Sequence, residues 1–157
     1  MSDNERIAHI FLDEHTVIRR SPQIEHERQV AIFDLLEDNS FKLNENQCGP
    51  YDLHLGVVDN RLIFDIRDEA DQGVLKFSLP GKTFRRVVRD YFMICESYFE
   101  AIKTKAPSQI EAIDMGRRGL HDEGAEILSE RLADQVSVDI QTARRLFTLV
   151  CVLHIRG

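Results

Sequence analysis

The chain has 157 residues, of which 43% are hydrophobic and 30% charged; this length and composition predict one soluble globular domain with a buried core. Its formal net charge of -7 disfavours a nucleic-acid partner, because nucleic-acid binding needs a basic face that releases counterions. No signal peptide and no apolar run of about 18 residues occurs, so we expect no membrane partner and a cytoplasmic location. The three cysteines form neither a CxxC pair nor an even disulfide set.

The first part of the chain predicts a strand followed by a helix. Residues 7–12 form a short apolar run that is typical of a strand. Ser21 and Pro22 then supply a hydroxyl N-cap and a proline at the first helical position. The predicted helix runs to about residue 37, and a polar loop that ends at Gly49-Pro50 follows it.

Residues 51–67 predict an antiparallel hairpin. Apolar and polar residues alternate on both sides of Asp59-Asn60, two residues that tolerate the positive φ angles of a tight turn. This turn places Leu55 opposite Phe64 on the apolar face and His54 opposite Asp65 on the other face. The pair of His54 and Asp65 is either an acid/base pair or a solvated cross-strand contact. A third strand is expected at residues 75–79.

Two long helices follow in the predicted order. The first covers residues 83–105 with Thr83 as its N-cap, and its aromatic stripe is typical of a core-facing helix. The second covers residues 108–132 with Ser108 as its N-cap, after a break at Ala106-Pro107. The exposed side of the first helix carries the densest basic cluster of the chain, formed by Arg85, Arg86 and Arg89.

The end of the chain predicts a short edge strand at residues 134–138 and a last helix capped by Asp139. This helix is apolar on nearly all sides, which indicates burial within the fold or in an oligomer interface; a strand from Val150 is the alternative. The predicted fold class is α+β: an antiparallel three- to four-stranded sheet with about four helices packed on one face, in a single domain over residues 1–157.

The polar segment 114–124 is the candidate site. Helical spacing places Asp114, Arg117 and His121 on or beside the apolar face, with Arg118 just off its edge. Charged groups there need partners, and Asp114 can pair with either arginine because residues three and four apart are neighbours on a helix. Each helical glycine costs about 1 kcal/mol relative to alanine, so a kink, a left-handed backbone or a close approach is expected at Gly116, Gly119 and Gly124.

This segment has two interpretations. One is a structural salt-bridge cluster with packing glycines. The other is a site in which Arg117 and Arg118 clamp a carboxylate or phosphate, while His121, with Asp114, performs general acid/base catalysis near neutral pH. In this second interpretation the three glycines allow the ligand to approach the helix. No Walker loop, dinucleotide-binding turn, HExxH or GxSxG motif occurs, so we expect no cofactor and no metal.

Two resemblances bear on this segment. The residues Arg117 and His121-Asp122 resemble the pattern around the phosphoacceptor histidine of sensor-kinase dimerisation helices, in which the histidine is exposed and the adjacent acid orients its ring.

Four longer blocks resemble uncharacterised protein family 0262, a family of small alphaproteobacterial proteins; these blocks cover residues 25–28, 34–41, 107–121 and 142–148. The family resemblance implies a bacterial cytoplasmic protein and assigns no activity, catalytic residue or cofactor.

The favoured functional prediction is a non-enzymatic interaction or regulatory module that self-associates as a homodimer or binds a protein partner. It would use an apolar helix face and the arginine-rich helix edges. The alternative is a small enzyme or an anionic-ligand binder centred on Arg117, Arg118, His121 and Asp114. A cleft at His121 with both arginines pointing into it would favour the alternative, whereas sealed packing around that histidine would favour the interaction module.

Overall fold

The computed structural model describes residues 4–13, 22–45 and 49–153. The described residues form a four-stranded sheet in the order β1-β3-β4-β5, a two-stranded sheet of β2 and β6, and four helices. In chain order the elements are β1 (Ile7–Asp13), α1 (Pro22–Glu37), β2 (Phe41–Leu43), β3 (Tyr51–Val58), β4 (Arg61–Arg67), β5 (Gly73–Pro80), α2 (Lys82–Thr104), α3 (Pro107–Leu132), β6 (Val136–Val138) and α4 (Ile140–Leu153). The predicted α+β class is confirmed, with a mostly antiparallel sheet.

The hairpin of β3 and β4 has the predicted register. Leu55 lies opposite Phe64 and His54 opposite Asp65. Asp59 and Asn60 have φ angles of 52° and 63°, the left-handed backbone that a two-residue hairpin turn needs. The alternation of apolar and polar residues and the chemistry of the turn therefore specify the same pairing.

The main sheet departs from the fully antiparallel expectation at one edge. β1 pairs with β3 in parallel, because the chain crosses over through α1 and returns to lie beside β1 in the same direction. The small sheet joins β2 to β6, with Phe41 opposite Val138. The expected edge strand is therefore present at Val136–Val138, the second part of the predicted segment 134–138, but its partner β2 was not predicted.

The predicted N-cap residues of the two long helices, α2 and α3, were wrong. Gly81 is the N-cap of α2 and Ala106 that of α3, in place of Thr83 and Ser108. The side chain of Gln109 instead accepts a 3.4 Å hydrogen bond from the Ala106 N–H.

The expected caps of the other two helices have different outcomes. Asp139 caps the start of α4, accepting a 2.9 Å hydrogen bond from the Thr142 N–H. The expected Ser21 cap lies outside the described residues, although α1 begins at Pro22 as predicted. α4 is helical to Leu153, so the alternative of a strand from Val150 is wrong.

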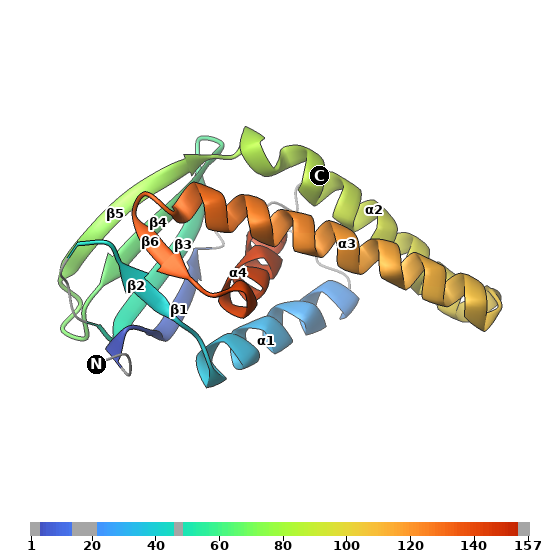
Figure 1. Cartoon of the computed structure of the whole chain (residues 1–157), viewed down its shortest axis with the longest axis horizontal. Helices are drawn as coiled ribbons and strands as arrows, with labels where there is room; N and C mark the ends of the chain where they lie inside the picture. The colour runs from blue at the N-terminus through green and yellow to red at the C-terminus, as the bar shows by residue number, and fades with distance from the viewer. Residues whose placement is uncertain (1–3, 14–21, 46–48, 154–157) are drawn as a thin grey trace.

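The last helix, α4, is the centre of the molecule. It lies between α1 and α3 (Figure 1), and its side chains are buried on several faces, as its apolar sequence predicted. The paired helices α2 and α3 extend away from the sheet as a long hairpin (Figure 1). Within the described part of the chain, no helix combines the length and apolar character needed to cross a membrane.

Candidate functional site

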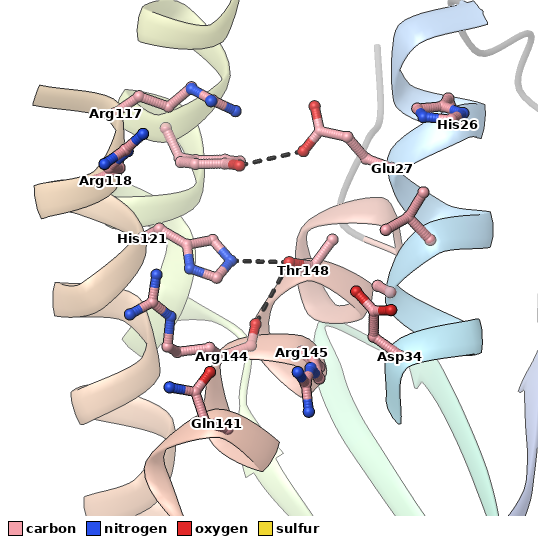
Figure 2. Close-up of a pocket in the computed structure, with 13 residues that line it drawn as sticks. His26, Glu27, Asp34, Arg117, Arg118, His121, Gln141, Arg144, Arg145 and Thr148 are labelled. Atoms are coloured by element: carbon pink, nitrogen blue, oxygen red, sulfur yellow. Dashed lines mark hydrogen bonds between the residues drawn. The ribbon is translucent and has the colours of Figure 1, made fainter. Parts of the chain in front are cut away.

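A cavity of about 530 Å³ opens among α1, α3 and α4. Four of its lining side chains are arginines, although the chain as a whole has a net charge of -7. Figure 2 shows α1 on one side of the cavity and α3 on the other, with α4 between them. The lining residues are His26, Glu27, Val30, Ala31, Asp34, Tyr91, Arg117, Arg118, His121, Gln141, Arg144, Arg145 and Thr148.

Helical spacing explains why the lining residues share one surface on each helix. Residues at i, i+3, i+4 and i+7 lie along one face of an α-helix. The α1 residues at 27, 30, 31 and 34 follow this spacing, and so do the α4 residues at 141, 144, 145 and 148. The α3 residues at 117, 118 and 121 do the same, with 114 as the position one turn earlier.

On α3, Asp114 holds both arginines of the candidate site. Its carboxylate lies 2.7 Å from Nη2 of Arg117 and 2.9 Å from Nη2 of Arg118. The hydrogen bond from Arg117 is the main reason that the pKa of Asp114 lies below its usual range. Arg117 also places its guanidinium carbon 4.5 Å from the centre of the Tyr98 ring. Asp114 itself is not among the lining residues, so its part in the site is to position Arg117 and Arg118.

His121 points from α3 toward α4 (Figure 2), where its Nε2 lies 2.7 Å from the Thr148 hydroxyl oxygen. Its ring is half-buried, with the rings of Tyr91 and Phe147 each 5.5 Å away. Burial, and then the positive charge of Arg144, lower the pKa of His121 to about 4. The imidazole is therefore neutral at pH 7 and can exchange hydrogen bonds with a ligand. A pKa this low argues against general acid/base catalysis near neutral pH.

α4 adds two arginines that the sequence-based site did not include. The Nη1 atom of Arg144 lies 3.1 Å from the Asp122 carboxylate. Arg145 donates a 3.1 Å hydrogen bond to the backbone carbonyl of Asp38, at the end of α1. Asp122 is thus paired with an arginine, and His121 is half-buried and bonded to Thr148. This arrangement differs from the exposed histidine and ring-orienting acid of the sensor-kinase helices.

The α1 side of the cavity is acidic. Glu27 extends from α1 into the cavity and accepts a 3.1 Å hydrogen bond from the Tyr91 hydroxyl (Figure 2). Burial raises the pKa of Tyr91 above its usual range, so this hydroxyl keeps its proton and remains a donor. Asp34 lies two turns further along α1 and also faces the cavity (Figure 2).

The three glycines of α3 lie outside the cavity lining, in three different environments. A Cβ atom on Gly124 would overlap the ring of Phe147, so α3 and α4 pack closely there. A Cβ on Gly116 would lie 2.7 Å from the Cδ1 atom of Ile94, the flexible end of an α2 side chain. A Cβ on Gly119 would meet no atom within 4 Å. Close packing of the two helices explains why position 124 is a glycine. None of the three glycines lines the cavity, so the cavity lining does not support the expected approach of a ligand to them.

Several charged residues of the other polar clusters in the sequence pair with neighbours. Asp65 pairs with Arg67 at 2.8 Å, whereas His54 stacks on Phe11 with ring centres 4.5 Å apart, so the two strand residues do not form an acid/base pair. In the exposed basic cluster of α2, Arg86 pairs with Asp90 and Glu123. Across residues 4–13, 22–45 and 49–153, no group of three or more His, Cys, Asp or Glu side chains is arranged to hold a metal ion.

Half of the arginine cluster was predicted from the sequence. Arg117, Arg118 and His121 were predicted because charged residues and glycines are concentrated in one short segment. Arg144 and Arg145 were not predicted, although a polar stripe with i, i+3, i+4 and i+7 spacing on an otherwise apolar helix is a detectable signal. The acidic residues of α1 gave no signal, because acids on a helix of mixed composition are usually solvated.

The chemistry of the cavity favours recognition of an anion. Guanidinium groups are planar, stay charged at all relevant pH values and bind carboxylates or phosphates with paired hydrogen bonds. The Thr148 hydroxyl and the neutral His121 ring add polar contacts within the same cavity. A volume of about 530 Å³ falls within the range of about 300–1,000 Å³ that is typical of small-molecule sites.

Comparison with known proteins places the chain among relatives of similar length. The profile of UPF0262, an uncharacterised protein family, matches residues 4–156. A UPF0262 protein of Paramagnetospirillum magneticum is 57% identical over 157 residues, covering 100% of both chains. One of Rhodospirillum rubrum is 59% identical over 100% of this chain and 97% of its own. One of Rhodopseudomonas palustris (strain TIE-1) is 54% identical over 98% of this chain and 94% of its own. No solved structure gives a significant match.

Proposed function

Since the chain belongs to UPF0262, a family described as uncharacterised, we propose a function from the chemistry of its cavity: the protein binds a small molecule through an anionic carboxylate or phosphate group. The observation that carries this proposal is the convergence of four arginines from α3 and α4 on one cavity of an acidic protein. Both arginines of the sequence-based site line this cavity beside His121, the arrangement that favours a ligand binder over a sealed structural cluster.

The cost of assembling these cations supports a binding role. Like charges held close together repel each other, and partly burying them removes water that would otherwise solvate them. Asp114 and Asp122 offset part of this cost from positions behind the arginines. Because these two acids do not line the cavity, the guanidinium groups remain accessible to a ligand from the cavity side.

We propose binding rather than catalysis at this site. A general base works best with a pKa near the working pH, and the pKa of His121 is about 4. The neutral ring instead contributes a hydrogen bond to the ligand or holds Thr148 in place. This proposal takes up the anionic-ligand binder that the sequence offered as the alternative, without the enzymatic role.

Isothermal titration calorimetry with inorganic phosphate and with glutarate tests the proposal. We expect the wild-type protein to bind at least one of them, and Arg145→Gln and Arg118→Gln each to weaken binding by about tenfold, the loss typical of one charged hydrogen-bonding group. Arg131→Gln is the matched control, because Arg131 is exposed on α3 and lies outside the cavity lining. Absence of wild-type binding at millimolar concentrations, or equal losses in all three variants, would overturn the proposal.

Self-association is a second candidate function, which the sequence favoured. The α2–α3 hairpin extends away from the sheet (Figure 1) and exposes Met93 at 61%, Ile102 at 52% and Met115 at 64%. Exposed apolar side chains on a projecting element favour contact with a second chain. Light scattering after size exclusion tests this: a dimer that becomes monomeric in the Met93→Gln, Met115→Gln double variant supports it, and a monomeric wild-type protein contradicts it.

A further inference from the structure

The cavity has two walls of opposite charge. Arg117, Arg118 and Arg144 line one side, and α1 contributes Glu27 and Asp34 to the other (Figure 2). Arg145 reaches from α4 to the end of α1, where it bonds the Asp38 carbonyl. The two acids are seven residues apart, so both lie on the face of α1 that is turned toward the cavity. A ligand inside the cavity would therefore meet cations on one side and carboxylates on the other.

The two walls do not neutralise each other. Among the described residues, no carboxylate oxygen of Glu27 or Asp34 lies within 4.0 Å of a nitrogen of the four lining arginines. Three of those arginines pair instead with Asp114 and Asp122, which lie outside the lining. Within this cavity of about 530 Å³, the two α1 carboxylates therefore form no ion pair with the lining arginines, which leaves them able to bind a positively charged group of a ligand.

A hydrogen bond from a neighbouring helix holds Glu27 in position. The Tyr91 hydroxyl from α2 donates a 3.1 Å hydrogen bond to Oε1 of Glu27. The Tyr91 ring is buried and packs against Phe147 of α4 with ring centres 6.1 Å apart. A carboxylate has about four lone-pair positions, so one hydrogen bond from Tyr91 leaves Glu27 able to accept others from a ligand.

We propose that the ligand is a zwitterion: a small molecule that places its carboxylate or phosphate against the arginine wall and a protonated amino group against Glu27 and Asp34. This inference rests on the proposed anion-binding function and adds the chemical class of the ligand. An ammonium group supplies three hydrogen-bond donors and no acceptor, which suits two carboxylates on one helix face. The cavity volume suits a molecule from the size of an amino acid to that of a dipeptide.

Matched ligand pairs that differ in the amino group test the proposal. Titration calorimetry compares L-glutamate with glutarate, and O-phosphoethanolamine with ethyl phosphate, so that the two pairs distinguish a carboxylate from a phosphate source. In at least one pair we expect the amino compound to bind the wild-type protein at least about tenfold tighter, as a charge-assisted hydrogen bond allows.

Three variants locate that preference on α1. Glu27→Gln retains an oxygen that can accept the Tyr91 hydrogen bond, and Asp34→Asn gives a second, independent variant. We expect each to reduce the preference for the amino compound severalfold while glutarate or ethyl phosphate still binds. Glu37→Gln, an exposed acid of α1 outside the lining, serves as the control and keeps the full preference.

The outcomes separate the two proposals. If the plain anion binds as tightly as its amino partner in both pairs, or if the preference survives both Glu27→Gln and Asp34→Asn, the zwitterion proposal is wrong and anion binding stands. If no member of either pair binds the wild-type protein at millimolar concentrations, anion binding fails and the zwitterion proposal fails with it.

Discussion

The Nε2 atom of His121 lies 2.7 Å from the hydroxyl oxygen of Thr148, and this contact joins α3 to α4 at the wall of the cavity. Thr148 also donates a 3.3 Å hydrogen bond to the carbonyl of Arg144, one turn earlier in α4. The imidazole is therefore held in one orientation between two helices. Burial at this contact between two helices also lowers the pKa of the imidazole.

Protonation of His121 should couple stability to pH. The pKa of His121 is about 4 in the folded protein, chiefly because of burial, against 6.5 for an ordinary histidine. Between these values the unfolded chain binds a proton and the folded chain does not, so stability is full above pH 6.5 and falls as the pH drops to about 4. We expect a loss on the order of 2–3 kcal/mol from this group.

Urea denaturation of the wild-type protein and of His121→Gln at a series of pH values measures this coupling. The variant lacks the imidazole, so the difference in unfolding free energy between the two proteins should change across this interval and level off outside it. A constant difference from pH 4 to pH 7 would show that the histidine titrates alike in the folded and unfolded chains.

Two glycine substitutions on α3 should have opposite effects. Gly124→Ala brings a methyl group into steric overlap with the ring of Phe147 and should destabilise the protein by about 2–3 kcal/mol, as overpacking does. Gly119→Ala adds a methyl group that meets no atom within 4 Å and should stabilise it by about 0.5–1 kcal/mol through helix propensity. Thermal denaturation of both variants measures the contrast; equal midpoints would mean that α3 and α4 are not in close contact at Gly124.

Asn39 should be a structural anchor between α1 and β1. Its amide donates to the carbonyl oxygens of Ile7 at 3.0 Å and Leu35 at 2.8 Å, and accepts from the Ile7 N–H at 2.7 Å. Asn39→Ala should lower the unfolding free energy by about 2–3 kcal/mol, because it leaves part-buried backbone groups without partners. Asn44→Ala is the comparison: it removes hydrogen bonds that are more exposed to solvent, so it should lower the unfolding free energy less. Chemical denaturation of both variants measures the difference, and equal losses would contradict this assignment.

Salt should weaken ligand binding through the arginine wall. Raising NaCl from about 50 mM to about 500 mM screens charge interactions, so we expect the affinity for a bound phosphate or glutarate to fall severalfold. The weaker residual binding of Arg145→Gln should depend less on salt than that of the wild-type protein, because one of its cations is gone. Titration calorimetry at both salt concentrations measures the difference; an affinity that does not change with salt would argue against recognition by charge.

The elements that could be predicted from the sequence are those with local signals. The β3–β4 hairpin could be predicted because a period of two and the Asp59-Asn60 turn both act over neighbouring residues. The burial of α4 followed from its apolar composition. Arg117, Arg118 and His121 were found for the same reason, since the charges and glycines that mark them lie within one stretch of α3.

Contacts between residues that are distant in the sequence depend on how the whole fold packs. The pairing of β2 with β6 and the parallel contact of β1 with β3 join segments that no local pattern connects. The same is true of the cavity: Glu27 on α1 and Arg145 on α4 line one cavity with His121 only because of how the three helices pack together. Helical periodicity fixes which residues share a face, whereas the packing of whole helices fixes which faces oppose one another, and that packing is a property of the complete core.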